Sequence, residues 1–307
     1  MIVNPKIDKL KNNVVVFLRI CFSRPSYAFS FIVILLYVVG GLFVVAGFIP
    51  PLPPGKGGWE NIYAPPSLKD FPWYILGTDF AGKPLFLAIV RAIPSTFAVA
   101  LIAAFITVGL GVVVGMIGGY LGGKVDVILW ILTNVALSIP SGFLALILAI
   151  IMPTDLKGNV AIMGVILSIT AWASLARSIR AQILSLKRRE FIDVAKVVGF
   201  SSWKIMFDEL IRITAPFIAV NFMFAITSAI YNYTGLAYLG LLPLTSENWG
   251  VQINMAVAVG GALYSDRAII ALWSPAIAII LLQYSLLSMA RAIEEYINPA
   301  LRITRSR

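Results

Sequence analysis

Six long runs of residues contain no Asp, Glu, Lys or Arg, and these runs limit how the chain can fold more than any other feature. A helix needs about 20 apolar residues to cross a bilayer, and each run is about that long or longer. Hydrophobic residues make up 60% of the chain and charged residues 12%, whereas soluble domains average about 45–50% and about 25%. The sequence therefore predicts an all-α membrane protein with six transmembrane helices. The runs are Tyr27–Ile49, Ser95–Tyr120, Val127–Met152, Gly158–Ala176, Ile213–Ser246 (with its span over about residues 215–233) and Ala268–Ala290.

The positive charge of the chain is divided unevenly by these helices. Six spans place both termini on one side of the membrane. That side carries 18 of the 24 Lys and Arg residues and 8 of the 14 Asp and Glu residues, and the other side carries 6 of each kind. Because cytoplasmic segments are enriched in Lys and Arg, we predict that both termini are cytoplasmic. The net charge of +10 then records orientation, and no nucleic-acid partner is predicted.

The same runs predict the organisation of the chain. A cytoplasmic N-terminal segment precedes the first transmembrane helix, and a long extracytoplasmic loop separates that helix from a five-helix core and a cytoplasmic tail. The predicted bounds are 1–26 for the N-terminal segment, 27–49 for the first helix, 50–94 for the loop, 95–290 for the core with a cytoplasmic loop over 177–212, and 291–307 for the tail.

The predicted spans lack the groups that membrane chemistry uses. Ionisable residues inside a membrane mark proton or ion pathways, and the six runs contain none. The chain has no His and a single cysteine, Cys21, which excludes His-based acid–base catalysis and a disulfide within the chain. We predict no catalytic residue, no metal site and no cofactor in this chain. An energy source is expected in another subunit.

The 177–212 loop carries a helical pattern of its own. Gly199 is placed to end a first helix as its C′ residue, and Ser201 or Ser202 is suited to cap a second helix that begins at Trp203. Two interpretations stay open from the pattern alone. The element is either an amphipathic hairpin on anionic lipid or a docking element for a cytoplasmic partner. The apolar residues that recur at helical spacing in the first helix are Phe191, Val194, Ala195 and Val198.

Polar residues within the apolar runs are candidates for a translocation path. Pro140 lies within the third run and predicts a kink, with Asn134 and Ser138 close by in sequence. The fifth run carries polar side chains that should face the bundle rather than lipid. Both sets either line a pore or only pack helices together. The candidates on the fifth run are Asn221, Thr227 and Asn232.

Glycines on the second run predict close packing against a neighbouring helix. They are Gly111, Gly115, Gly118 and Gly119.

Several motifs, in their order and spacing, resemble those of a known family. Glu190–Ala195, followed by three residues and Gly199, resembles the EAA–x₃–G loop of ABC importer permeases. The wider resemblance, over residues 20–302, is to the C-type permease of dipeptide and oligopeptide importers. Its other motifs correspond to Leu76–Gly82 (LGTD-x-x-G), Gly119–Asp126 (GY-x-GG-x-x-D), Ile139–Ser141 (F-P-S), Tyr238–Leu241 (F-L-G-L), Asn248–Gly250 (S-W-G) and Asn298–Arg302 (D-P-x-L-R).

The chain departs from the family pattern at three positions. Pro84 stands where the family usually has Asp, and Val194 replaces the first Ala of EAA. Arg212 replaces a Pro that commonly opens the next helix, although Pro216 matches the following Pro. Because Arg212 lacks the fixed backbone angle of Pro, the entry into the fifth span need not share the kink that is usual in the family.

The resemblance implies a fold, a mechanism and partners. The fold is the type I ABC importer permease fold, with one N-terminal helix ahead of a five-helix core in a prokaryotic cell (plasma or inner) membrane. The partners are a homologous second permease, two cytoplasmic ABC ATPase subunits that bind ATP and Mg²⁺, an extracytoplasmic substrate-binding protein and the lipid bilayer. The 177–212 loop would couple ATP hydrolysis to alternating access. Its expected coupling residues are Glu190, Phe191, Asp193, Ala195, Gly199, Ser201, Ser202, Trp203 and Lys204.

The outer loops are the expected docking surface for the binding protein. Thr78 and Asp79 of the LGTD-like motif and Trp249 are the candidate contacts, although an aromatic residue there also suits the aromatic belt of a membrane interface. The resemblance implies peptides as the cargo, with oligosaccharides, nickel chelates or other solutes as the alternative. An autonomous channel or carrier, and a membrane-embedded enzyme or assembly scaffold, are the alternatives from other classes.

Overall fold

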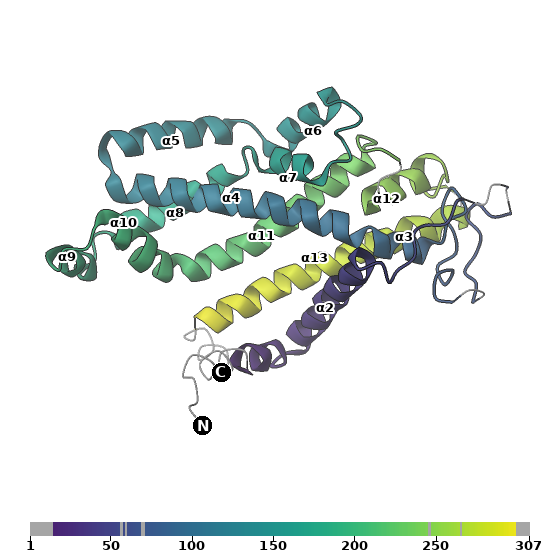
Figure 1. Cartoon of the computed structure of the whole chain (residues 1–307), viewed down its shortest axis with the longest axis horizontal. Coiled ribbons are helices and arrows are strands. Elements are labelled where there is room, and N and C mark those ends of the chain that lie inside the picture. Colours follow the sequence, from purple (N-terminus) through teal and green to yellow (C-terminus); the bar gives the residue numbers. More distant parts are fainter. Residues whose placement is uncertain are drawn as a thin grey trace.

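The computed structural model describes residues 15–55, 58, 60–68, 71–244, 247–264 and 266–298. These residues form helices and loops and contain no strand, apart from one isolated bridge between Thr78 and Pro84. Figure 1 shows an elongated bundle with α9 at one end and the loops around α3 and α12 at the other. We call these the α9 end and the loop end.

The helices follow the order of the apolar runs. A short helix over residues 15–21 precedes them. The bounds are α2 Pro25–Val45, α3 Leu85–Arg91, α4 Ile93–Leu121, α5 Gly123–Ser138, α6 Ser141–Ile151, α7 Val160–Ser168, α8 Trp172–Leu186, α9 Glu190–Val197, α10 Ser202–Lys204, α11 Ile211–Tyr238, α12 Trp249–Ala258 and α13 Ile269–Ile297, with a π-helical turn η1 at Ile205–Leu210 and a 3-10 turn η2 at Asp266–Ala268.

The predicted spans are confirmed, and two of them are broken. In the described part of the chain, four helical segments are long and apolar enough to cross a membrane, and two bent helix pairs raise this number to six. The α5–α6 pair bends by 69° and the α7–α8 pair by 48°. Pro140 explains the first bend, since it lacks a backbone N–H and holds the preceding Ile139 in an extended conformation.

Two helix bounds differ from the prediction. The fourth span continues past Ala176 to Leu186, because one face of α8 stays apolar and is buried. The connection between the fifth and sixth runs, for which no helix was predicted, contains the separate helix α12, which begins where the Asn248 side chain accepts a hydrogen bond from Gly250 N at 2.6 Å. Asn is a favoured N-cap residue, so this helix start was readable in the sequence.

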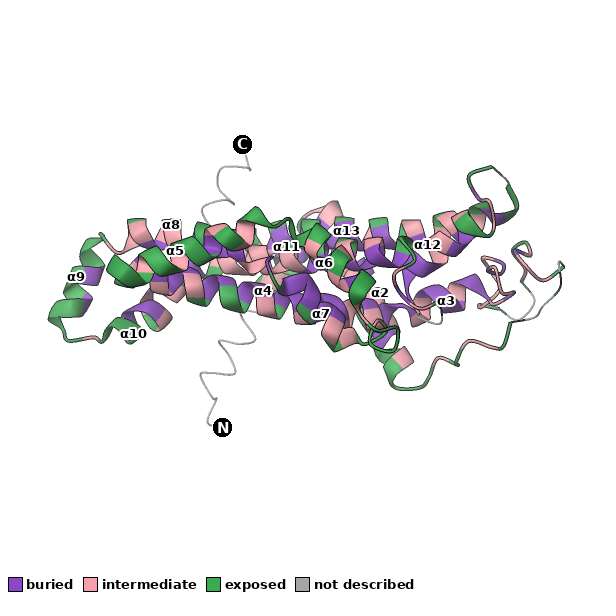
Figure 2. Ribbon diagram, turned by 90° about the horizontal axis from the view of Figure 1, so that it is seen from above, coloured by how far each residue is buried: buried purple, intermediate pink, exposed green. Residues whose placement is uncertain are grey.

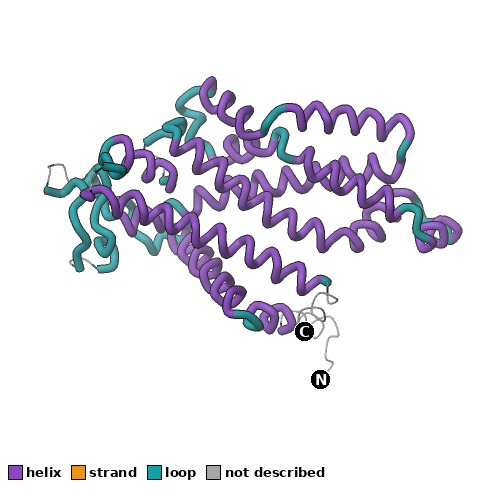
Figure 3. Tube along the Cα trace, turned by 180° about the vertical axis from the view of Figure 1, so that it is seen from behind, coloured by secondary structure: helices purple, strands orange, loops and turns teal. Residues whose placement is uncertain are grey.

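The helix α4 forms the centre of the bundle. It contacts α5, α7, α8 and α11, whereas α13 contacts α2, α11 and α12. Figure 2 shows the buried residues concentrated along the middle of the bundle, with exposed residues over much of α5 and α9. From behind, Figure 3 shows that the connecting loops gather at the ends of the long helices.

Glycines let α4 and α8 pack closely, as predicted. A Cβ atom added at Gly111 would lie 2.9 Å from Leu175 Cβ, and one added at Gly115 would lie 2.6 Å from the Ala176 carbonyl oxygen. One added at Gly119 would lie 2.8 Å from Ile183 Cβ. These three residues are spaced four apart and form one face of α4.

Some predicted features lie outside the described residues. They are residues 1–14 of the N-terminal segment, residues 56–57, 59 and 69–70 of the outer loop, and residues 299–307, which include most of the tail motif Asn298–Arg302.

Candidate functional site

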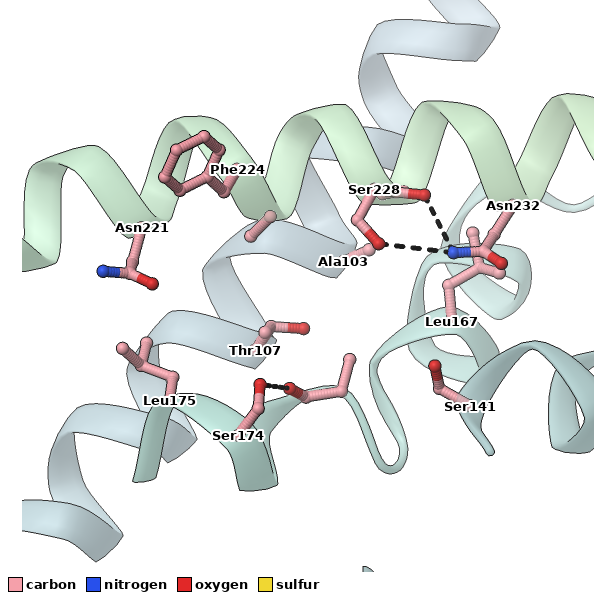
Figure 4. Close-up of a pocket in the computed structure, with 13 residues that line it drawn as sticks. Ala103, Thr107, Ser141, Leu167, Ser174, Leu175, Asn221, Phe224, Ser228 and Asn232 are labelled. Atoms are coloured by element: carbon pink, nitrogen blue, oxygen red, sulfur yellow. Dashed lines mark hydrogen bonds between the residues drawn. The ribbon is translucent and has the colours of Figure 1, made fainter. Parts of the chain in front are cut away.

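A cavity of about 190 Å³ lies between α4, α11 and the first turns of α6 and α8. Figure 4 shows side chains from these elements pointing toward a common space. Both broken spans therefore contribute to the cavity wall at the point where they bend. The lining side chains that carry a hydroxyl or an amide are Thr107, Ser141, Ser174, Asn221, Ser228 and Asn232, and no lining residue is charged.

The two amides of this cavity have the same local geometry. Asn221 Nδ2 donates to the Phe217 carbonyl at 2.8 Å, and Asn232 Nδ2 donates to the Ser228 carbonyl at 2.9 Å. Asn232 Nδ2 also donates to Ser228 Oγ at 3.4 Å. The acceptor oxygens of both amides and the second N–H group of Asn221 are left for a molecule in the cavity. The arrangement can hydrogen-bond a polar, uncharged group such as a peptide bond.

The structure brings only part of the predicted pore set to this cavity. Asn221 and Asn232 line it. Thr227 does not, because its side chain is buried and its carbonyl accepts a hydrogen bond from Gln283 of α13 at 3.2 Å. The cavity wall begins at Ser141, one residue beyond the predicted Pro140.

The other predicted residues of the third span lie away from the cavity. Asn134 Oδ1 accepts a hydrogen bond from Arg177 Nη2 at 2.6 Å, and Ser138 Oγ donates to the Asn134 carbonyl at 2.9 Å. The first contact holds α5 against α8, and the second lies within α5. Pro140 itself forms the bend and does not line the cavity.

Sequence reasoning missed Thr107, Ser174 and Ser228. Ser228 had a readable signal, because it lies seven residues after Asn221 and four before Asn232, which places all three on one face of a helix. Thr107 and Ser174 had no such signal, since a single hydroxyl in an apolar helix often bonds only to its own backbone.

The helix α9 extends from the bundle at the α9 end. Ile192 and Ala195 are buried and attach it to neighbouring residues of the bundle, whereas Val194 and Val198 are about two thirds exposed. Phe191 is also exposed. The apolar pattern predicted for this helix therefore divides into an anchoring side and an exposed side.

The turn after α9 has the predicted geometry. Gly199 has φ +89°, a conformation that favours glycine, and Ser201 Oγ accepts a hydrogen bond from Lys204 N at 3.3 Å as the N-cap of α10. Lys204 Nζ lies 3.8 Å from the centre of the Phe200 ring. Of the two serines proposed as the cap, the structure selects Ser201, and Ser202 is the first residue of the helix.

The remaining predicted coupling residues of this element are mostly exposed. Lys196 Nζ and Asp193 Oδ1 form an ion pair at 3.0 Å on the surface of α9. Glu190 is exposed at the start of the helix, and Trp203 is exposed and stacks on Phe207 with a centroid distance of 5.6 Å. The exposed face of α9 therefore combines apolar and charged side chains.

Thr78, Asp79 and Trp249, the candidate contacts for a binding protein, are all buried in this chain. Thr78 Oγ1 accepts from Ala64 N at 2.7 Å and donates to the Asn61 carbonyl at 2.6 Å. Trp249 Nε1 donates to the Ile89 carbonyl at 3.0 Å. These side chains shape the loop end rather than form its surface.

Asp79 organises the turn before α3. Its Oδ1 atom accepts hydrogen bonds from Ala81 N and Lys83 N, both at 2.8 Å. Burial raises the pKa of Asp79 above its usual value, although the N–H groups of Lys83 and Ala81 and the Lys83 charge oppose this shift. Burial, together with the charge of Asp79, also raises the pKa of Tyr63 to about 12.

An ion pair connects α5 to α8 near the α9 end. Arg180 donates from Nε to Asp126 Oδ1 at 2.5 Å and from Nη2 to Asp126 Oδ2 at 2.6 Å. Lys187 Nζ donates to the Gly119 carbonyl at 2.7 Å and so fixes the same corner of the bundle. Within the described residues, no group of three or more His, Cys, Asp or Glu side chains is placed to hold a metal ion.

Comparison with known proteins identifies the family. The sequence pattern of the family described as "Binding-protein-dependent transport system inner membrane component" matches residues 111–303, which is more than half of the chain. The chain belongs to this family. It is a multi-pass membrane permease component with the type I importer permease fold, as the sequence motifs implied.

Relatives of this permease are named as peptide transport components. It is 29% identical over 207 residues to the dipeptide transport system permease DppC of Lactococcus lactis, an alignment that covers 67% of this chain and 59% of the relative. It is 26% identical to DppC of Bacillus subtilis over 91% of this chain and 83% of the relative. It is 27% identical to the oligopeptide permease OppC of Haemophilus influenzae over 80% and 74%.

The matched part of the chain spans about three fifths of the length of two relatives. The share is 59% for the Lactococcus DppC and 61% for the oligopeptide permease OppC of Bacillus subtilis, which is 26% identical over 63% of this chain. The matched region of the permease contains α9, the cavity-lining residues of α11 and both broken spans.

Proposed function

We propose that the chain is the transmembrane permease subunit of an ATP-driven ABC importer and forms half of a translocation pathway for peptides. The names of its relatives, dipeptide and oligopeptide transport system permeases, support the peptide cargo. A homologous second permease completes the pathway. The neutral cavity, lined by amides and hydroxyls, is suited to hydrogen-bond a peptide backbone.

The observation that carries this proposal is the exposed apolar face of α9. Val194 and Val198 are about two thirds exposed at the far end of the bundle, where Figure 1 shows α9 beyond the other helices. Exposed apolar patches mark sites of protein interaction. Two cytoplasmic ATPase subunits, which bind the ATP and Mg²⁺, cover such a helix on this chain and on its partner permease.

The position of α9 provides a route for coupling. It lies between α8 and the continuous helical run Ser202–Tyr238, which contains α10, η1 and α11. Both neighbours line the cavity, α8 through Ser174 and α11 through Asn221. A movement of the ATPases against α9 therefore shifts two walls of the cavity and switches it between inward-facing and outward-facing states.

The orientation follows from the charge distribution. We place the chain in a prokaryotic inner membrane with both termini and α9 in the cytoplasm, because Lys and Arg are concentrated on that side. The loop end then faces the substrate-binding protein. Exposed Leu68, Phe71 and Tyr264 replace the buried residues as the candidate contacts.

A charge on the exposed face of α9 tests the coupling role. Val194→Glu should abolish the stimulation of ATP hydrolysis by loaded binding protein, because it places a carboxylate where an apolar partner surface is expected. The assay measures ATP hydrolysis by the reconstituted transporter with and without that protein. Leu121→Glu is the matched control, since Leu121 is also exposed near the α9 end but lies on α4.

Leu121→Glu should retain stimulation. Normal stimulation in a Val194→Glu transporter that inserts and assembles would contradict the assignment of α9. The cargo is tested separately, by uptake of labelled dipeptides and of an oligosaccharide into the same proteoliposomes. Uptake of the oligosaccharide alone would reject peptides as the cargo.

A further inference from the structure

A second cavity, of about 260 Å³, lies where the start of α2 meets the end of α13. Its lining combines two guanidinium groups with several hydroxyl groups, a composition different from that of the neutral cavity between α4 and α11. The lining residues are Arg24, Ser26, Tyr27, Tyr284, Leu287, Ser288 and Arg291.

The two arginines lie at the same boundary of the apolar core. Arg24 directly precedes α2, which contains no charged residue, and Arg291 is the first charged residue after the run Ala268–Ala290. The helix α2 packs against α13. Both guanidinium groups are therefore expected at the depth of lipid headgroups, where long basic side chains accumulate.

The electrostatics of this cavity favour an anion. Arg24 Nη2 forms an ion pair with Glu295 Oε1 at 3.7 Å, and its side chain is 38% exposed, so two guanidinium groups face one carboxylate. Tyr27 Oη donates to Glu295 Oε2 at 3.3 Å. Arg291 is exposed. The first turn of α2 has no acidic residue and no side-chain cap, so the positive end of the helix dipole faces the cavity region.

Apolar side chains continue from the cavity along the same two helices. On α2 they include the exposed Phe29 and Ile32, and on α13 the exposed Ile280 and Leu287. The rings of Phe29 and Tyr284 lie 6.2 Å apart and connect the two sets. A ligand with an anionic head and long apolar chains matches both parts of this surface.

We propose that this cavity binds the phosphate headgroup of an anionic phospholipid, with its acyl chains along α2 and α13. Arginine pairs well with phosphate oxygens, and basic pockets between transmembrane helices bind anionic headgroups. The bound lipid would fasten the N-terminal helix to the core. The proposal depends on the membrane location of the chain and not on its cargo or its ATPases.

The test uses native mass spectrometry of the full chain, purified with the subunits that accompany it, to compare which lipids the wild type and its variants retain. Phosphatidylglycerol should remain bound, and phosphatidylcholine should not. The variant Arg24→Gln/Arg291→Gln should bind phosphatidylglycerol at least about tenfold more weakly. The control Arg19→Gln/Lys124→Gln removes the same charge from exposed residues outside the cavity and should bind the lipid normally.

The single variant Arg291→Gln separates loss of binding from misfolding, because it keeps Arg24, which borders the start of α2. It should weaken binding while the protein stays monodisperse. Equal loss in the cavity variant and the control would overturn the proposal, as would equal binding of phosphatidylcholine. Displacement of the lipid by inorganic phosphate, with phosphate alone retained at the site, would reject lipid in favour of a free anion.

Discussion

At the scale of single residues, Asp79 shows how a motif residue can act through the backbone. Its carboxylate accepts two backbone N–H groups and is buried, so it fixes the turn that leads into α3. The sequence motif indicated that Asp79 has a role, but it did not show whether the side chain contacts a partner or holds the backbone. A short acidic side chain in a loop serves equally as a surface contact or as an internal acceptor, and only the fold decides between these roles.

Substitution of Asp79 separates the acceptor from the charge. Asp79→Ala should lower the free energy of unfolding by about 1–3 kcal/mol, because two N–H groups lose their acceptor. Asp79→Asn keeps a carbonyl oxygen in place of Oδ1 and should cost less. Thermal unfolding of the detergent-solubilised chain measures both. Equal destabilisation by the two variants would show that the negative charge, and not the acceptor, holds the turn.

The raised pKa of Asp79 also predicts a pH dependence. The folded state holds this proton more tightly than the unfolded state, so the stabilising contribution of Asp79 falls as the pH rises from about 4 through the raised pKa. Asp79→Asn should lack this part of the pH dependence. Unfolding of the wild type and the variant across this pH range checks the prediction, and identical profiles would contradict it.

At the scale of elements, the contact of α4 with α8 depends on three glycines. Gly115→Leu should destabilise the bundle by about 1–3 kcal/mol or prevent its assembly, because even a Cβ atom there would lie 2.6 Å from the Ala176 carbonyl oxygen. Gly109→Leu is the matched control on the same helix, since a Cβ atom at Gly109 meets no atom within 4 Å. Thermal stability in detergent compares the two.

Gly109→Leu should remain as stable as the wild type. Equal loss in both variants would indicate that any large residue in α4 is harmful and that the close packing at Gly115 is not the cause. The prediction of close packing from sequence succeeded here because the glycine spacing of four identifies one helix face without knowledge of the partner helix.

The ends of the helices were harder to predict from the sequence than their number and order. Charge marked the limits of the runs, but α8 continues through Arg177 and Arg180 because both find partners on α5. Such pairs join residues 43 and 54 positions apart, and no local pattern contains them. The break at Pro140 was predictable, because proline interrupts a helix. The 48° bend between α7 and α8 was not, because no proline lies there.

At the scale of the whole molecule, the two ends of the bundle differ in character. The α9 end holds a helical tip with apolar and charged groups, and the loop end holds buried aromatic and polar anchors with exposed Leu68 and Phe71. The orientation of these ends in the membrane was predicted from charge alone. The cavity required the fold, because its wall joins residues of α4, α6, α8 and α11.

Single cysteines test this orientation. Val197 at the α9 end is 89% exposed and Tyr264 at the loop end is 94% exposed. In a Cys21→Ser background, Val197→Cys should react with a membrane-impermeant maleimide only in inverted vesicles, and Tyr264→Cys only in intact spheroplasts. The parent without cysteine is the control. The opposite labelling pattern would reverse the proposed orientation.

The neutral wall of the cavity between α4 and α11 has a consequence for selectivity among cargoes. Hydroxyl and amide groups both donate and accept hydrogen bonds, so they are able to bond both the ammonium end and the carboxylate end of a zwitterion. Acidic, basic and neutral side chains on the cargo meet no opposing charge among the lining residues of this chain. Under the proposed function, this half of the passage would discriminate by width and hydrogen-bonding capacity and would tolerate cargo of either sign.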